Sequence, residues 1–432
     1  MGYGSRYVNP RDIRLPGGYA AQVFARGLTA PGSIAFDGDG VMYITDSGIT
    51  DGNGKLLRHC SGGFQVTADG FNPPVTGITY YEGSVYVAHK GSITSISKDG
   101  SRKDIIRGLP SFGDHANSGA AFSSYGKMYF GQGTATNSGI VGTDNRKWLM
   151  KYPFFHDLPG EKIRLNGHNF ETENIMSAAW DEKISTGAFL PFGTASSAGE
   201  IVSGALKASG SILYCGLDGS GLKQAAWGLR NPCCLRFDDK NRLFCTNRGM
   251  TLAGSRPVAA SPDEFLLIKH GYWYGWPDFT GGLPVTAPQY KPKGMDRPKF
   301  LLAEHPMTPP FPYALFEPGS GAAGFDFSPD SAFGRGDAYI AEFGNDADTR
   351  TGRKISRLDM RTRTLTPFAY NKTAGRYSGG FARPSDVKFG NDKAMYVADY
   401  GLFGSGGELI PDTGVIWRIY KFCTYRLARP RT

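Results

Sequence analysis

Three observations predict an all-β fold in which one hairpin unit is repeated around a ring. A short apolar strand, a polar turn rich in Asp and Gly, and a second apolar strand follow one another six times along the chain. The 432 residues include 60 glycines and 13% aromatic residues, a composition typical of short strands joined by tight turns. We find no amphipathic pattern of normal helix length. These features predict a six-bladed β-propeller with four antiparallel strands in each blade.

The six hairpins are spread over nearly the whole chain. They are APGSIAFDGDGVMYITDSG from Ala30, PPVTGITYYEGSVYVAHKG from Pro73, NSGAAFSSYGKMYFGQGT from Asn117, NPCCLRFDDKNRLFCTNRG from Asn231, GAAGFDFSPDSAFGRGDAYIAEFG from Gly321 and RPSDVKFGNDKAMYVADYG from Arg383. Further strands complete several units, for example SITSISKDG and RKDIIRGLP after the second, SILYCGLDG and LKQAAWGLRNP after the third, and KISRLDMRT and LTPFAYN after the fifth. Because each blade packs on its neighbours, so long a chain can form one domain.

The two ends of the chain are predicted to meet in the last blade. The sixth unit ends soon after GVIWRIYKF, before a fourth strand. The N-terminal stretch YAAQVFARGLTAP ends in the same GL…P pattern as IIRGLP and AAWGLRNP, so residues 19–28 are predicted to supply the missing strand and remove the exposed sheet edges. We therefore expect an N-terminal extension (1–18), one propeller (19–422) with an insert around 141–205, and a basic tail (423–432).

Charge and cysteine usage exclude several classes of protein. The formal net charge is +9, but the 48 basic residues are scattered and no block of five or six occurs, so nucleic acid is not a predicted partner. No apolar run reaches the roughly 18 residues that span a bilayer. The first residues, MGYGSRYVNPRD, show no apolar signal core, which leaves a cytosolic protein or one whose signal has been removed. The six cysteines have no zinc or c-type haem spacing.

Two of these cysteines lie on the fourth hairpin. If residues 238–241 form its loop, Cys234 stands opposite Cys245, and cross-strand geometry would allow a disulfide. The favoured alternative is two buried thiols that fill space in the core.

Several polar residues are predicted to meet at one face of the ring. In a propeller, the loop that enters the innermost strand and the loop that leaves the second strand emerge on the same face, above the axial channel. Arg230 and Asn231 enter blade four, His115 enters blade three and Arg383 enters blade six. Second strands end at Asp46, His89, Gly249, Phe343 and Asp399. Asn231 could serve turn chemistry alone, whereas an unpaired buried guanidinium at Arg230 would be costly.

The stretches GLRNPCCLRF, SPDEFLLIKHGYWYGWPDFTGG, DHANSGAAFSSYGKMYF and RPSDVKFGNDKAMYVADYG resemble the glucose/sorbosone dehydrogenase family of soluble, six-bladed quinoprotein sugar dehydrogenases. The resemblance covers nearly the whole chain at the level of blades. It implies pyrroloquinoline quinone (PQQ) and calcium on the axial face. It also implies that His115 is the general base, that Arg230 and Asn231 bind the cofactor, with Arg230 also catalytic, and that Arg383 is a further cofactor-binding residue.

The same resemblance implies metal ligands in blade four. Gly249 and Met250 match the positions whose main-chain carbonyls hold the catalytic calcium. Glu264 and Tyr274 have the spacing of a second calcium site, and Asp278 is a possible extra ligand. Calcium prefers such hard oxygen ligands. The residue types fit the chemistry, because arginines clamp an anionic quinone and a His of near-neutral pKa accepts a hydroxyl proton as hydride leaves.

The resemblance further implies a sugar or polyol substrate, a soluble electron acceptor and a periplasmic or extracellular location. The chain departs from the family pattern where Ser385 replaces a second basic residue and where Phe343 and Gly344 replace a lysine. The insertion TLAGSRPVAAS follows Met250, and Arg350, Arg353 or Lys354 are possible substitutes for the lysine. Two other functions stay open: a calcium-dependent lactonase-type hydrolase that uses carboxylates such as Asp46 and Asp399, and a non-catalytic propeller that binds glycan or protein.

Overall fold

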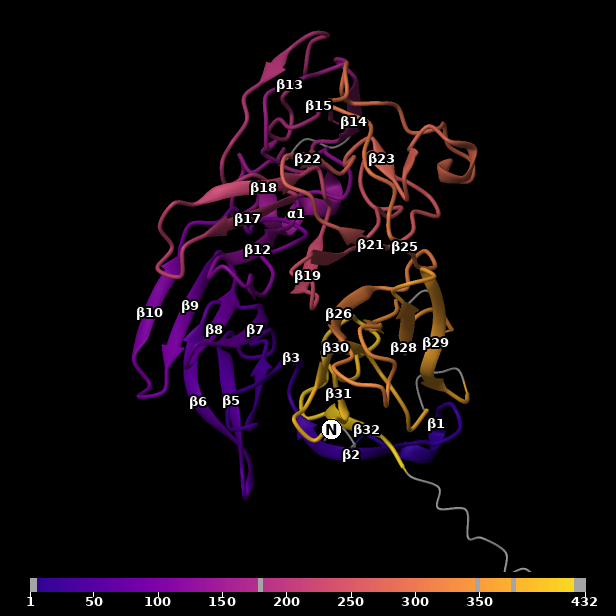
Figure 1. The fold of residues 1–432 in the computed structure, drawn as a ribbon. Helices are drawn as coiled ribbons and strands as arrows, with labels where there is room; N and C mark the ends of the chain where they lie inside the picture. The colour runs from indigo at the N-terminus through magenta and orange to yellow at the C-terminus, as the bar shows by residue number, and fades with distance from the viewer. Residues whose placement is uncertain (1–5, 178–181, 346–349, 374–377, 423–432) are drawn as a thin grey trace, which may run out of the picture.

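The computed structural model describes residues 6–177, 182–345, 350–373 and 378–422, so the expected tail at 423–432 lies outside the described residues. Six sheets of the chain, each built on four antiparallel strands, are arranged around a central axis, as the sequence predicts (Figure 1). The only α-helix in the described ranges is the single turn α1 (Arg146–Leu149). The fold is therefore an all-β, six-bladed propeller.

Each blade starts at the axis and runs outward. Blade one contains β3 (Pro31–Phe36), β4 (Met42–Asp46), β5 (Gly54–Cys60) and β6 (Gly63–Phe71), and blade two contains β7 (Val75–Tyr81), β8 (Ser84–His89), β9 (Ser92–Ser97) and β10 (Arg102–Ile106). Blade three contains β11 (Ala121–Phe122), β12 (Met128–Gln132), β17 (Ser211–Cys215) and β18 (Lys223–Trp227), and blade four contains β19 (Pro232–Phe237), β20 (Leu243–Asn247), β21 (Glu264–Leu267) and β25 (Ala314–Leu315). Blade five contains β26 (Ala322–Phe327), β27 (Ala338–Glu342), β28 (Lys354–Asp359) and β29 (Thr364–Asn371), and blade six contains β30 (Pro384–Phe389), β31 (Met395–Asp399), β32 (Gly414–Lys421) and β2 (Tyr19–Leu28).

The burial of each strand follows from its place in the blade. Every residue of the second strands β12, β20, β27 and β31 is buried, because each of these strands is covered by neighbouring blades on both faces. The outer strands β6 and β29 instead mix exposed and buried positions. This difference explains the apolar runs MYFGQ, LFCTN, AYIAE and MYVAD, which recur once per unit in the sequence.

The ring is closed by the first long strand of the chain. Strand β2 pairs antiparallel with β32 from Tyr19↔Lys421 to Leu28↔Gly414, with Val23 opposite Trp417. The indigo β2 therefore lies beside the yellow β32 in Figure 1. Trp417 is fully buried and anchors this seam. The predicted closure of the last blade by residues 19–28 is confirmed.

The segment before β2 also packs on the ring. Strand β1 (Ile13–Arg14) adds a fifth strand to blade five by pairing with the end of β29. Arg6 reaches blade six, where its Nη2 lies 2.6 Å from the Oδ2 atom of Asp399 and its Nη1 donates to the Thr413 carbonyl. Residues 6–14 therefore connect blades five and six.

The long connection inside blade three forms a separate lobe on one side of the ring (Figure 1). It contains two short ribbons, β13 (Ile163–Arg164) with β16 (Ile201–Val202) and β14 (Asn169–Glu173) with β15 (Lys183–Gly187). The lobe packs on the loops of blade four that carry β22 (Tyr272–Trp273), β23 (Phe279–Thr280) and β24 (Leu283–Pro284). None of the described helices has the length and apolar character needed to cross a membrane.

The register of β19 and β20 overturns the expected pairing of Cys234 with Cys245. A bulge between Pro232 and Cys234 shifts the strands by one residue, so Cys234 faces Thr246 and Cys245 faces Leu235. Cys234 and Cys245 belong to different clusters of the core, and both are free and buried. Cys234 and Cys245 are therefore two buried thiols that fill space in the core, as the favoured alternative predicted.

Candidate functional site

A cavity of about 360 Å³ opens over the axis of the propeller. All six blades contribute to its wall, because the loops that enter the inner strands converge there. The polar and aromatic residues of the wall are Ser33, Thr76, Asp114, His115, Asn117, Ser118, Asn231, Arg236, Arg248, Phe343, Ser385, Asp386, Tyr400 and Phe403. Of the predicted site residues, this cavity brings together His115 and Asn231.

His115 is held in place by the backbone of the neighbouring strand. Its N–H donates to the Thr134 carbonyl at 3.1 Å, and the adjacent N–H of Asp114 donates to the Ala135 carbonyl at 3.0 Å. A Cβ atom at Gly133 would lie 2.4 Å from the Cβ atom of His115, so only glycine allows this close approach. The GQGT stretch after β12 is therefore part of the support for the imidazole.

The electrostatics around His115 favour a neutral imidazole. Burial holds the pKa of His115 well below its ordinary value, and the guanidinium groups of Arg230 and Arg248 lower that pKa further. The Nε2 atom is buried and makes no hydrogen bond to a described residue. A neutral ring in a cavity wall is able to accept a proton from a hydroxyl group at physiological pH.

Asp114 adds a second titratable group to the cavity. Asp114 lines the cavity, and desolvation by the surrounding chain raises the pKa of its carboxyl to about 7, against the opposing effect of Arg230. Its Oδ1 atom accepts a hydrogen bond from Asn145 at 3.0 Å. The charge of the cavity therefore changes near neutral pH.

Arg230 and Asn231 are fixed by one side chain of blade four but point in different directions. The Oδ1 atom of Asn247 accepts hydrogen bonds from the backbone N–H groups of Arg230 at 3.1 Å and Asn231 at 2.9 Å. Asn231 lines the axial cavity. The guanidinium of Arg230 instead turns to Asn137, where it donates to the main-chain carbonyl and to the side-chain oxygen, both at 3.0 Å. Arg230 therefore lies behind the cavity wall.

Arg383 is also placed behind the wall. It is buried, its backbone N–H donates to Asp399 at 2.7 Å, and its Nη1 atom donates to the Phe343 carbonyl at 3.4 Å. The guanidinium lies 5.4 Å from the ring centroid of Phe343 and 5.6 Å from that of Phe403. Arg383 thus supports the two aromatic rings at the cavity mouth.

Four of the five predicted metal ligands surround a separate small cavity of about 10 Å³ in blade four, namely Gly249, Met250, Glu264 and Tyr274. Burial raises the pKa of the Glu264 carboxyl to about 7, and its oxygens accept hydrogen bonds from Asn247 at 2.8 Å and from the Gly281 N–H at 2.6 Å. The Tyr274 hydroxyl is already engaged with Leu267. Within the described ranges no three His, Cys, Asp or Glu side chains are arranged to hold a metal ion.

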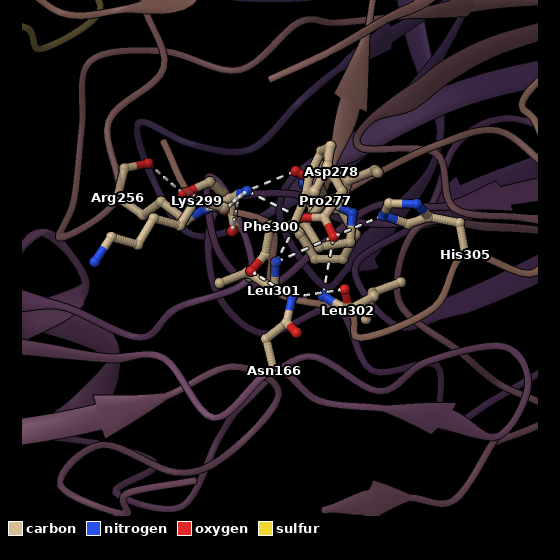
Figure 2. Close-up of polar contacts among 12 residues, drawn as sticks. Asn166, Arg256, Pro277, Asp278, Lys299, Phe300, Leu301, Leu302 and His305 are labelled. Carbon is tan, nitrogen blue, oxygen red and sulfur yellow. Dashed lines mark hydrogen bonds and ion pairs between the residues drawn. The ribbon is translucent and has the colours of Figure 1, made fainter. Parts of the chain in front are cut away.

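The structure gives Asp278, the fifth predicted ligand, a different set of partners. Its Oδ1 atom lies 2.9 Å from Nη2 of Arg256, and its Oδ2 atom lies 3.1 Å from Nε2 of His305. The backbone N–H groups of Leu301 and Leu302 also donate to the carboxylate at 2.9 Å (Figure 2). Asp278 therefore ties together loops that lie behind the small cavity.

The insertion after Met250 is anchored away from the axial cavity. Thr251 donates its N–H to the Oδ1 atom of Asn137 at 2.8 Å, and Asn137 in turn donates to the carbonyls of Thr251 and Ala253. Arg256 reaches from this insertion into the cluster of Figure 2, where it donates to the carbonyls of Ser138 and Pro277. The insertion thus joins the lobe of blade three to the loops of blade four.

The expected substitutes for the missing lysine are not part of the cavity wall. Among the residues that the structure describes, the wall contains neither Arg350 nor Arg353 nor Lys354. Lys354 pairs instead with Glu342 and Glu317, both at 3.4 Å. The cations that do line the cavity, Arg236 and Arg248, were not predicted.

The fold and the axial cavity define a class of protein, the six-bladed propellers with a polar site above the axis. No family model matches the sequence, and no curated protein matches it. The PQQ-bound aldose sugar dehydrogenase of Streptomyces coelicolor is similar in structure, with a TM-score of 0.54 at 16% identity over 94% of this chain and 100% of that one. The holo PQQ domain of the Coprinopsis cinerea pyranose dehydrogenase has a TM-score of 0.58 at 13% identity, over 94% of this chain and 97% of that one.

The apo aldose sugar dehydrogenase of Escherichia coli is also similar, with a TM-score of 0.56 at 14% identity over 94% of this chain and all of that one. These proteins share the fold of this chain over almost their full length. The expected fold of the soluble PQQ-dependent sugar dehydrogenases is therefore confirmed.

Proposed function

We propose that the chain is an oxidoreductase that oxidises a sugar or related polyol at its hemiacetal or alcohol carbon, with PQQ as hydride acceptor and calcium as metal. The observation that carries the proposal is His115, a neutral imidazole in the wall of an axial cavity that also contains Asn231 and Arg248. The structural neighbours that contain PQQ and act on aldoses or pyranoses support the same reaction class.

The residues of the cavity fit a planar, anionic quinone. Arg248 offers N–H donors to carboxylates, and the amide of Asn231 can bond to carbonyl or carboxylate oxygens. The aromatic rings of Phe343, Tyr400 and Phe403 line the same cavity and offer apolar faces to a planar ring system. A catalytic calcium would be held by the main-chain carbonyls of Gly249 and Met250, and a second calcium by the carboxylate of Glu264 and the carbonyl of Tyr274; all four residues line the small cavity.

The chain's own residues would bind the substrate and move its proton. When bound, PQQ supplies the acceptor for the hydride, and calcium polarises its carbonyl. His115 takes the proton of the substrate hydroxyl as its carbon is oxidised, because its imidazole is kept neutral. Arg230 acts as a positioning residue whose charge lies behind the wall, where burial lowers its pKa only to about 10, so that it stays cationic.

The lactonase-type alternative is weaker, because its candidate carboxylates are occupied. Asp399 accepts hydrogen bonds from Arg6, Trp417 and the backbone N–H groups of Ala382 and Arg383. Asp46 pairs with Lys55 at 3.6 Å, and neither aspartate lines the axial cavity. A periplasmic or extracellular location and a soluble electron acceptor complete the proposal by analogy with the family.

The proposal is tested by titrating the purified chain with PQQ in the presence of calcium and then in the presence of a chelator. We expect saturable binding at micromolar PQQ, loss of binding after chelation, and reduction of a redox dye when aldoses are added. If PQQ does not bind at these concentrations and no aldose reduces the dye, the oxidoreductase is refuted and the glycan- or protein-binding propeller becomes the better explanation.

The affinity for PQQ is expected to fall as the pH rises through about 7. Asp114 loses its proton in this range, since its pKa is raised to about 7, and the cavity then gains a negative charge close to an anionic ligand. A change of roughly threefold to tenfold is expected for one added charge at a partly solvated site. PQQ titrations between pH 6 and 8 measure the effect, and Asp114→Asn should bind with an affinity that no longer varies over this range. An equal pH dependence in wild type and variant would assign the titration to another group.

A further inference from the structure

We propose that Arg248 is the residue that clamps a carboxylate of the anionic ligand in the axial cavity, in the role for which a lysine was expected in blade five. The inference rests on the proposed function and assigns one of its binding contacts. It is carried by the position of Arg248, by the donors that its guanidinium leaves unused, and by the pairing of the neighbouring cations.

Arg248 stands at the end of β20, where the second strand of blade four reaches the cavity. Its backbone N–H donates to the carbonyl of Asn231 at 3.2 Å, so these two lining residues of blade four are linked directly. Its Nε atom donates to the carbonyl of Ala322 on β26 at 3.2 Å, which fixes the side chain across the seam between blades four and five.

The rest of the guanidinium is left for a ligand. Its centre lies 5.6 Å from the ring centroid of Phe343, a cation–π distance. Its Nη1 and Nη2 atoms make no hydrogen bond to a described residue, and no described carboxylate lies within ion-pair distance. Two parallel Nη–H donors match the two oxygens of a carboxylate.

The second cation of the cavity is already neutralised. Arg236 lies 3.8 Å from the Oδ1 atom of Asp386, and Asp386 is further fixed by Ser33 and by the Ile34 N–H. Gly324 makes room for this carboxylate, since a Cβ atom there would lie 2.2 Å from Oδ1. The pair sits in the cavity wall without net charge, which leaves Arg248 as the described cation of the wall that has no acidic partner.

The other basic residues expected at the site have partners of their own: Arg230 contacts Asn137, Arg383 contacts the carbonyl and ring of Phe343, and Lys354 pairs with Glu342 and Glu317. Phe343 stands at the position of the expected lysine, and its ring lies beside both Arg248 and Arg383. The positive charge missing from position 343 is therefore supplied by blade four. The charge of Arg248 lies close enough to His115 to lower the pKa of that imidazole.

The test compares PQQ binding by wild type, Arg248→Gln, Arg248→Lys and Arg242→Gln, each titrated in calcium and followed by the absorbance of the quinone. Loss of a charge-assisted bidentate contact is expected to weaken binding by roughly tenfold to a hundredfold in Arg248→Gln, with partial recovery in Arg248→Lys. Arg242 is the matched control, because it lies on the same hairpin and pairs with Asp238 at 2.6 Å, outside the cavity.

A neutral planar ortho-quinone, 9,10-phenanthrenequinone, separates recognition of the carboxylate from the shape of the cavity. Arg248→Gln is expected to bind this probe as wild type does, with an unchanged melting temperature. The role of Arg248 is overturned if wild type and Arg248→Gln bind PQQ with equal affinity. It is also overturned if Arg248→Gln loses affinity for PQQ and for 9,10-phenanthrenequinone by the same factor. Either result leaves the proposed function intact. If Arg248→Gln does not fold, Arg248→Met replaces it in the test, because methionine is a long side chain without a charge. Wild-type affinity of Arg248→Met for PQQ would then overturn the role of Arg248. Failure of wild type to bind PQQ refutes the proposed function itself.

Discussion

Replacing His115 with alanine is expected to lower the turnover of sugar by about a hundredfold to ten-thousandfold, the range typical for loss of a general base. The structure gives a physical reason, because desolvation, aided by the charges of Arg230 and Arg248, lowers the pKa of His115 and keeps the imidazole neutral and ready to accept a proton. Proton abstraction belongs to the transition state, so kcat should fall far more than the affinity for PQQ. Steady-state dye-linked oxidation measures turnover, and titration of the quinone absorbance measures binding.

The matched control is His156→Ala, which removes an imidazole whose Nδ1 atom is hydrogen-bonded to the Phe154 carbonyl in the lobe of blade three and which does not line the axial cavity. This variant should keep wild-type turnover and wild-type binding of PQQ. If His115→Ala kept turnover within about threefold of wild type, His115 would have no role as general base, and Asp114 would be the next residue to replace.

Replacing Asp278 with alanine is expected to destabilise the fold by about 3–5 kcal/mol, the range for breaking a buried ion pair. Arg256 is nearly inaccessible to solvent and directs donors to the carbonyls of Ser138, Pro277 and Lys299 as well as to Asp278. Without the carboxylate, this guanidinium and the N–H groups of Leu301 and Leu302 would be left buried without their partner. Chemical denaturation measures the loss of stability.

Asp239→Ala in an exposed turn of blade four is the control and should change the unfolding free energy by less than about 0.5 kcal/mol. The same experiment decides between the two roles considered for Asp278. If the residue is structural, added calcium should stabilise wild type and Asp278→Ala by equal amounts. A calcium effect that disappears only in the variant would make Asp278 a metal ligand.

The architecture could be predicted from the sequence because its signals are local and repeated. Each unit carries its own alternation of apolar strand and Asp/Gly turn, and the GL…P ending identified residues 19–28 as the strand that joins β32. The register of β19 against β20 could not be predicted in the same way. A bulge between Pro232 and Cys234 leaves no clear pattern in the sequence, yet it moves every later side chain of the pair by one position.

The site was predicted only in part, because the sequence does not show in which direction each side chain points. Chain order alone places His115 and Asn231 at the mouth of the cavity, and both line it. Arg230 precedes Asn231 directly, but Asn137, which is 93 residues away in the chain, draws its guanidinium behind the wall. Arg248 carries no motif of its own and precedes the glycine expected to bind calcium. Its importance becomes visible only when the partners of the other cations are known.

The pairing of β2 with β32 also imposes an order in time on the formation of the ring. Strand β2 precedes the first five blades along the chain, whereas its partner β32 follows them. Until that partner exists, β2 is a strand without a sheet, and blades one and six cannot close around the axis. Contacts between residues so far apart in sequence form slowly. Until they form, unpaired strand edges can associate with those of other chains. Until β32 has formed, the unpaired β2 and the open seam between blades one and six are therefore the parts of this chain most exposed to association with other chains.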